Sequence, residues 1–270
     1  MSDWDAAGIL VAQAIRIIRQ MKPQQGESLY LLIDDTRIKK RGKKRDGISK
    51  IWDPKSHCFV HGHMVVSAAI QFCGVTIPWA IALWLPRAYA GAPESLRRAV
   101  LSKTNRNSRR PDWPFSRLGR TGEVRLVVSK RSKRGGRELL SVVTNEVTMK
   151  PRQILATYER RWSIEVLFKE LRTSLGLGEY QVLRRTAIER HLHLSCAAHQ
   201  TLTHQALKDE GAQATQKDKE VVLPALGDRI QSFRHRVNRD RTDRMLNQIK
   251  DKKRKQKVRY YLIQEAPVAA

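Results

Sequence analysis

The chain has 270 residues, enough for one large domain or two smaller ones, and its 52 Lys and Arg against 26 Asp and Glu give a formal charge of +26. This excess favours a polyanionic partner, and nucleic acid fits better than a membrane because no apolar run approaches the roughly 20 residues needed to cross a bilayer. The three cysteines are odd in number and far apart, so neither a disulfide framework nor a cysteine zinc site is indicated.

A reducing, intracellular setting is expected from this cysteine usage, and the first residues lack the pattern of a secretory signal. Residues 1–28 predict an N-terminal helical segment, in which Ser2 or Asp3 caps a helix that ends before Pro23. The apolar residues that recur there at helical spacing are Ile9, Leu10, Ala14, Ile17, Ile18 and Met21.

A short all-apolar run, LYLLI at 29–33, leads directly into Asp34 and Asp35. The run predicts a central strand that is buried on both faces and carries the two carboxylates at its end. Strand ends hold active-site carboxylates rigidly beside open space in many α/β folds. This stretch therefore favours an α/β fold class and marks a candidate site.

The segment 37–57 is basic and contains glycines, which predicts a loop. A solvated surface loop would have the same composition. Its position next to the two aspartates nevertheless favours contact with a nucleic-acid backbone. The lysines expected to make that contact are Lys39, Lys40, Lys43 and Lys44.

Two pairs of antiparallel strands are predicted further along the chain. Branched and partly alternating residues indicate strands at 59–74 and 76–85. A second pair, at 123–129 and 138–147, is joined by a basic turn with two glycines. Between the pairs, prolines and a basic run predict irregular structure over 86–120.

The stretch from Tyr158 to Arg172 is the most informative in the chain. At about 100° per residue, Tyr158, Arg161, Glu165 and Arg172 share one stripe of a helix that Pro151 begins. A carboxylate between cations can hold a divalent metal while the cations grip phosphate. A solvated amphipathic helix with i,i+4 ion pairs would show the same residue types. The apolar stripe that would dock on a core is Ile164, Leu167, Phe168 and Leu171.

A second long helix is predicted at 188–207, and the remaining residues, 208–270, form a basic helical C-terminal region. The basic runs at 234–244 and 250–259 are of a kind that usually forms a solvated face or a frayed tail. They can also add non-specific affinity for DNA.

Two of these segments resemble the DDE transposases of bacterial insertion sequences. In LLIDDTRIKKRGKK, at 31–44, an apolar strand runs into Asp-Asp-Thr and a basic loop, and the resemblance implies that Asp35 is the first catalytic aspartate. The helix is similar to the family's Tyr-Arg-Glu-Lys signature, which Tyr158, Arg161 and Glu165 match. Arg172 stands where Lys is usual, which keeps the charge but replaces a point donor with a planar fork.

The resemblance covers most of 29–207 and implies a transposase catalytic domain with a ribonuclease-H-like mixed sheet flanked by helices. Asp35 and Glu165 would be catalytic residues and would hold two Mg²⁺ ions with a third carboxylate. The tyrosine and the two arginines of the signature would contact DNA phosphates. The implied partners are transposon ends and target DNA, bound by a homodimer in a synaptic complex, in the bacterial cytoplasm near the nucleoid.

The middle aspartate of the family has no evident counterpart. Between Asp53 and Asp209 the one aspartate is Asp112, which lies between prolines with no preceding strand. We infer an internal deletion near 86–100 that removed roughly one helix and the strand with this carboxylate. The sheet would then be incomplete, because its first strand would lose a parallel neighbour and be left with either an unpaired edge or a compensating rearrangement, and the metal site would be impaired.

Three functions remain open from the sequence. The first is an insertion-sequence transposase that cleaves and transfers DNA strands with metal, including a deleted and inactive copy of one. The second is a non-catalytic DNA-binding remnant of a transposase. The third, a basic protein that binds RNA, rests on charge alone.

Overall fold

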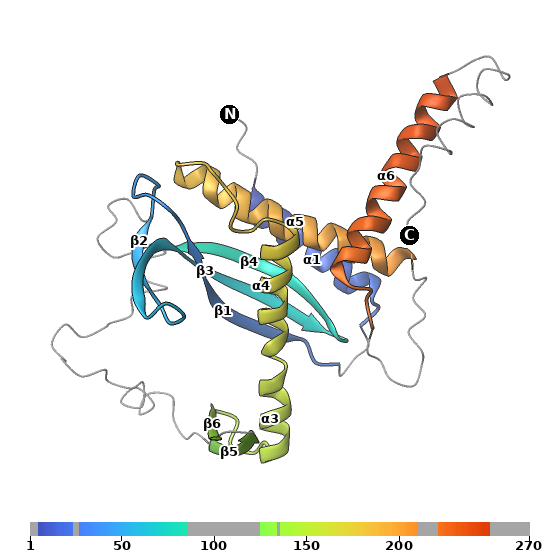
Figure 1. Cartoon of the computed structure of the whole chain (residues 1–270). Helices are drawn as coiled ribbons and strands as arrows, with labels where there is room; N and C mark the ends of the chain where they lie inside the picture. The colour runs from blue at the N-terminus through green and yellow to red at the C-terminus, as the bar shows by residue number, and fades with distance from the viewer. Residues whose placement is uncertain (1–4, 24–26, 86–124, 134–135, 210–220, 249–270) are drawn as a thin grey trace.

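The computed structural model describes residues 5–23, 27–85, 125–133, 136–209 and 221–248. Asp112, the proposed deletion near 86–100 and the basic run at 250–259 lie outside the described residues. The described chain is a mixed α/β structure (Figure 1). Its elements are α1 (Ala6–Gln20), β1 (Tyr30–Lys39), β2 (Ser49–Asp53), β3 (Cys58–Phe72), β4 (Val75–Trp84), β5 (Arg125–Lys133), β6 (Gly136–Thr144), α3 (Pro151–Glu159), α4 (Trp162–Ser174), α5 (Arg185–Asp209) and α6 (Leu226–Gln248).

The main sheet is antiparallel and is organised around β3, with which β1, β2 and β4 all pair. The pairing of β1 with β3 places Asp34 opposite Ser67 and Asp35 opposite Val66. Among the described strands β1 pairs only with β3, so the other edge of β1 has no strand partner there. An unpaired edge is one of the two outcomes that the deletion hypothesis allows, and the hypothesis itself remains a prediction because the region near 86–100 lies outside the described residues.

The helices α1, α4 and α5 pack on one face of this sheet (Figure 1). Alternate residues of the strands, such as Leu32, Val65 and Ile81, are buried against apolar residues of the helices, such as Ile164 and Leu192. These side chains form one continuous core, which is what burial of one sheet face against helices produces.

The first strand departs from the prediction in two ways. It extends to Lys39, so Asp34 and Asp35 lie within the strand and not at its end. Its residues also alternate between buried and exposed, with Leu31 and Ile33 60% and 63% exposed. The prediction of a strand buried on both faces was therefore wrong, because the all-apolar run concealed the period-two pattern of a sheet that helices cover on one face.

The predicted loop at 37–57 also contains a strand. β2 pairs with the first residues of β3, with Trp52 opposite Phe59, and its residues Ile51 and Asp53 are buried. The strand pairs that the sequence predicted around 59–85 and 123–147 are confirmed as β3–β4 and β5–β6. The strand character of β2 was not predicted because lysines on its exposed face and in the flanking turns give the segment the composition of a loop.

The predicted single helix from Pro151 through Arg172 is interrupted. α3 ends at Glu159 and α4 begins at Trp162, and the backbone N–H groups of Arg161 and Ser163 bond three residues back, to Tyr158 and Arg160. Such i→i+3 turns are tighter than an α-helix and break its phase. The two helices nevertheless continue roughly in line (Figure 1).

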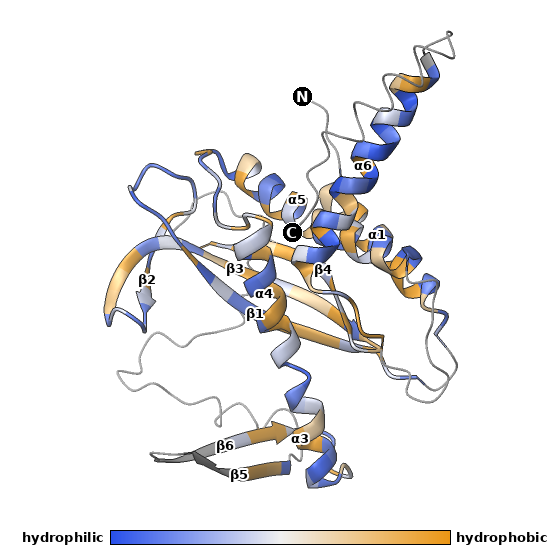
Figure 2. Ribbon diagram, turned by 45° about the vertical axis from the view of Figure 1, so that its right-hand side comes forward, coloured by the Kyte–Doolittle hydropathy of each residue, from blue (hydrophilic) through white to orange (hydrophobic). Residues whose placement is uncertain are grey.

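The long helix α6 extends away from the sheet, and much of its length is hydrophilic (Figure 2). Its first turns are anchored by Leu226 and Arg229, which are buried, whereas its exposed residues include Arg234, Arg239 and Arg241. Part of the predicted basic C-terminal region is thus a projecting helix. Within the ranges given above, no helix is both long and apolar enough to cross a membrane.

Candidate functional site

The centre of the candidate site is a guanidinium held between two carboxylates. Arg161, at the start of α4, places Nη2 2.7 Å from Oε1 of Glu165 one turn later. Its Nη1 lies 3.0 Å from Oδ2 of Asp34 on β1. All three side chains remain partly exposed, at 39% for the arginine, 34% for the glutamate and 26% for the aspartate. The contact therefore joins the helix to the sheet at a place that solvent reaches.

Asp35, the aspartate that the resemblance assigns, is not part of this ion-paired group. Successive side chains of a strand leave opposite faces, and Asp34 points to the helix side. Asp35 is exposed. The structure thus brings Glu165 together with Asp34, and the assignment of Asp35 remains a prediction.

The other two signature residues, Tyr158 on α3 and Arg172 on α4, lie on either side of the Arg161–Glu165 pair in the chain. The Tyr158 ring lies beside Arg161, with the guanidinium carbon 5.5 Å from the ring centroid. Burial opposes the charge on Arg161, but its hydrogen bond to Tyr158 and the charge of Glu165 together raise its pKa. Arg172, two turns beyond Glu165, is exposed and donates from Nη2 to the Arg37 carbonyl over 3.3 Å.

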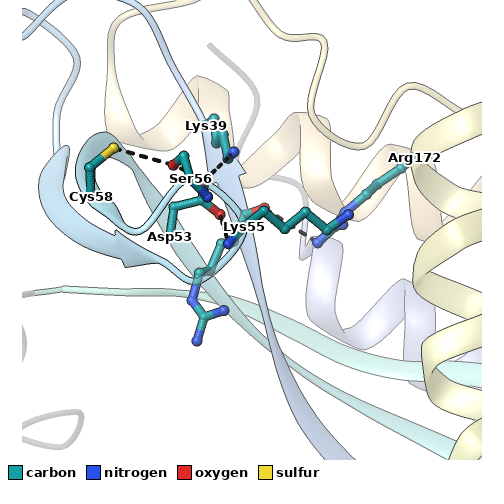
Figure 3. A network of polar contacts seen from close by, with 7 residues as sticks. Lys39, Asp53, Lys55, Ser56, Cys58 and Arg172 are labelled. Carbon is teal, nitrogen blue, oxygen red and sulfur yellow. Dashed lines mark hydrogen bonds and ion pairs between the residues drawn. The ribbon is translucent and has the colours of Figure 1, made fainter. Parts of the chain in front are cut away.

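Two of the four lysines predicted to bind DNA make intramolecular contacts. Lys39 places Nζ 2.5 Å from Asp53, although 54% of its side chain stays exposed (Figure 3). Lys40 donates to the carbonyls of Gly178 and Tyr180, over 2.6 and 2.8 Å, and lies 3.6 Å from the centroid of the Tyr180 ring. Lys40 therefore fastens the loop after α4 to the end of β1.

The environment of Lys40 lowers its pKa to about 8, chiefly because burial disfavours the charged form and secondarily because Arg45 is close. By contrast, Lys43 and Lys44 are exposed in the turn that follows β1. A fully exposed ammonium is the better phosphate ligand, since it loses no internal contact on binding. The DNA-binding role of the four lysines remains a prediction, and the structure favours Lys43 and Lys44 for it.

The carboxylates of the described residues do not by themselves fit a two-metal site. A hard divalent cation takes several oxygen ligands, and a two-metal centre shares carboxylates between its ions. Here Asp34 and Glu165 both face a guanidinium, and no group of three or more His, Cys, Asp or Glu in the described residues is arranged to hold a metal. A third carboxylate from the remaining residues would be required.

Asp34 is the site residue that the sequence analysis did not assign. A signal for it exists in the pattern of β1, where Leu32, Thr36 and Ile38 are buried at even positions. Asp34 is also at an even position, so its side chain leaves the same face of β1, the face that the helices cover. A strand expected to be buried on both faces gives no reason to separate Asp34 from Asp35.

A strand carboxylate, an arginine–glutamate pair on a packed helix and exposed lysines define a basic α/β protein with an ionic site that solvent reaches. Comparison with family models sharpens this class, because residues 86–200 match the family described as Transposase DDE domain. Over this segment the chain is similar to the DDE transposases. The match contains Tyr158, Arg161, Glu165 and Arg172, whereas β1 and its aspartates precede it. A search of curated proteins finds no match.

Proposed function

We propose that the chain is an insertion-sequence transposase that binds transposon-end and target DNA through the surface around α4, and that its capacity for metal-dependent strand cleavage and transfer is impaired. The proposed fold of its catalytic domain, residues 29–207, is ribonuclease-H-like, with residues 1–28 as a helical lead and 208–270 as a basic helical extension. Homodimeric synapsis and a place at the bacterial nucleoid belong to the same proposal.

The observation that carries this proposal is the convergence of Arg161, Glu165 and a β1 aspartate in a chain that matches the Transposase DDE domain family over residues 86–200. Arg161 is permanently charged, and its planar fork suits a phosphate oxygen pair as well as a carboxylate. A DNA phosphate would compete with Asp34 and Glu165 for this guanidinium. Tyr158 and Arg172 would flank the bound strand, and Lys43 and Lys44 would contact the backbone beyond it.

Metal chemistry in this family would be supplied by Mg²⁺ held by Asp35, Glu165 and a further carboxylate. We base the impairment on the sequence, in which the family's middle aspartate has no evident counterpart, together with the pairing of Glu165 to Arg161. The role of each aspartate in the proposal can be separated because the two are neighbours in sequence and leave opposite faces of one strand.

The test uses the purified full chain with a labelled supercoiled plasmid and linear duplex DNA, with and without an excess of MgCl₂. We expect salt-sensitive DNA binding and little or no nicking. Metal-dependent nicking that Glu165→Gln abolishes would overturn the impairment. In that case Asp34→Asn and Asp35→Asn form a matched pair, and the one that abolishes nicking identifies the catalytic aspartate.

A non-catalytic DNA-binding remnant is the second candidate. It is favoured by the ion pairing of both carboxylates with Arg161, which gives them a structural role without metal. Under this alternative Asp34→Asn lowers the free energy of unfolding and leaves DNA affinity unchanged or higher, because Arg161 is released for phosphate. A chain that fails to bind DNA at low salt would contradict both candidates.

A further inference from the structure

The β2–β3 hairpin carries an exposed aromatic pair that the site around α4 does not use. Trp52 and Phe59 are directly opposite one another across the two strands, with ring centroids 5.3 Å apart and planes at 68°. They are 46% and 66% exposed. His57 adds a third ring, 6.5 Å from that of Trp52 and also exposed.

The turn that joins these strands is held by a compact polar network (Figure 3). Asp53 is 4% exposed and accepts from the backbone N–H of Ser56 over 3.2 Å, from the Ser56 hydroxyl and from Lys39. The lysine and the serine hold the pKa of this carboxyl well below its usual range. The aromatic rings are therefore presented by an ordered turn.

Charge around the rings has one sign. Lys50 and Lys55 are exposed on either side of Trp52, and Lys39 is half exposed nearby. The one acidic residue between 49 and 61 is Asp53, whose side chain is buried and already paired. Exposed aromatic faces beside exposed lysines such as Lys50 and Lys55 attract a ligand that combines flat apolar rings with negative charge.

We propose that the hairpin residues Lys50, Trp52, Lys55 and Phe59 form a platform on which unpaired bases of a DNA strand stack while the lysines contact its phosphates. The proposal deepens the proposed function and rests on it, since it takes DNA as the ligand. Phe59 precedes Ser67, the partner of Asp34, by eight residues of β3, a span of roughly 26 Å at about 3.3 Å each, so one DNA strand of several nucleotides is long enough to reach both the platform and Arg161.

The alternative is that the rings serve only to stabilise the hairpin, as cross-strand aromatic pairs do. That role predicts a loss of thermal stability on truncation but no discrimination between single-stranded and duplex DNA. Stacking predicts the discrimination, because bases inside a duplex do not offer their faces.

The experiment measures the affinity of the full chain for single-stranded and duplex DNA by fluorescence anisotropy at one salt concentration. The ligands are an oligo-dT of about 30 nucleotides and a duplex of about 30 base pairs, each long enough for several binding sites. The variants are Trp52→Leu, Trp52→Phe and, as an exposed apolar control on α5, Leu194→Ala. We expect Trp52→Leu to weaken oligo-dT binding about 5- to 100-fold and duplex binding less than about 2-fold, with Trp52→Phe restoring most of the loss.

Photocrosslinking of a bromodeoxyuridine oligonucleotide to the wild-type chain supplies a second readout, with adducts expected on the peptide that contains Trp52 or Phe59. Equal weakening of both DNA forms by Trp52→Leu, or crosslinks confined to other peptides, would overturn the platform while leaving the proposed function intact. Failure of the wild-type chain to bind either DNA would overturn both.

Discussion

Arg161 connects the helix to the sheet through its ion pairs with Asp34 and Glu165, and the same guanidinium is the proposed phosphate ligand. Each phosphate contact of a protein with duplex DNA contributes about 0.9 to the slope of log affinity against log salt concentration. We therefore predict that Arg161→Gln makes this slope shallower by about 0.9 and weakens binding at low salt. Anisotropy titrations at several salt concentrations measure the slope.

The control for this substitution is Arg19→Gln, at the exposed end of α1 and away from the site. It removes the same charge from the chain, so a change common to both variants would reflect net charge alone. An unchanged slope for Arg161→Gln would show that the guanidinium stays with its carboxylates when DNA is bound.

Lys40 gives a prediction about pH. Its pKa is about 8 in the folded chain and near 10.5 when unfolded, so between these values the unfolded state binds more protons. The lysine's contribution to the free energy of unfolding therefore increases as pH rises from 8 to 10.5. We predict that the wild-type chain becomes more stable relative to Lys40→Met over this window, as urea unfolding at pH 7, 8, 9 and 10 would measure.

A difference between the two chains that stays constant or shrinks with rising pH would contradict this environment for Lys40. The neighbouring Lys39→Met serves as the control, since Lys39 is half exposed and pairs with Asp53.

The helices α4, α5 and α6 are joined by a buried polar network. Glu170 on α4 accepts from His199 over 3.0 Å and pairs with Arg229 over 3.4 Å, and Arg229 also donates to Thr203 over 2.9 Å. Burial lowers the pKa of His199, although its hydrogen bond to Glu170 opposes this effect. The network fixes the root of α6 to the helix that carries Glu165.

We predict that Arg229→Met lowers the free energy of unfolding by roughly 2–3 kcal/mol, since it leaves Glu170 with one partner fewer in a largely buried position. Trypsin should then cleave α6 faster, because its first turns lose their attachment. Arg234→Met, an exposed position on the same helix, should change the free energy of unfolding by less than about 0.5 kcal/mol. Equal effects of the two variants would refute the anchoring role.

The interruption between α3 and α4 changes how the side chains of the two helices are oriented relative to one another. The backbone of Arg161 bonds back to Tyr158 across i→i+3, so the side chains on the two sides of this turn are not in phase with one continuous helix. Tyr158, Arg161 and Glu165 nevertheless lie together, since Arg161 contacts both the Tyr158 ring and the Glu165 carboxylate. Arg172 follows Glu165 by about two turns of the uninterrupted α4 and contacts the Arg37 carbonyl of β1.

For the whole molecule, the face of the main sheet opposite the helices has a consequence for solubility. Leu31 and Ile33 are exposed there, and one edge of β1 is without a strand partner in the described part of the chain. Apolar edge strands are templates for pairing between chains. We predict that Ile33→Lys slows aggregation, measured by light scattering at matched concentration, and changes Tm by less than about 2 °C.

Leu32→Lys is the matched comparison, because Leu32 is the next residue and is buried in the core under the helices. It should unfold the chain or lower Tm strongly, since a charge would replace an apolar core contact. A strong loss of stability from Ile33→Lys as well would mean that residues outside the described ranges cover this face.

The sequence by itself determined the basic character of the chain, both predicted strand pairs and the amphipathic stripe of α4, because composition and short-range periodicity encode them locally. It also pointed to Arg161 and Glu165, which are one turn apart. The pairing of Asp34 with them required the tertiary structure, because which face of β1 meets α4 depends on contacts between residues 127 positions apart. The same holds for Lys40, whose loop partners lie 138 and 140 positions away, and for β2, whose strand character arises from pairing with β3 despite a loop-like composition.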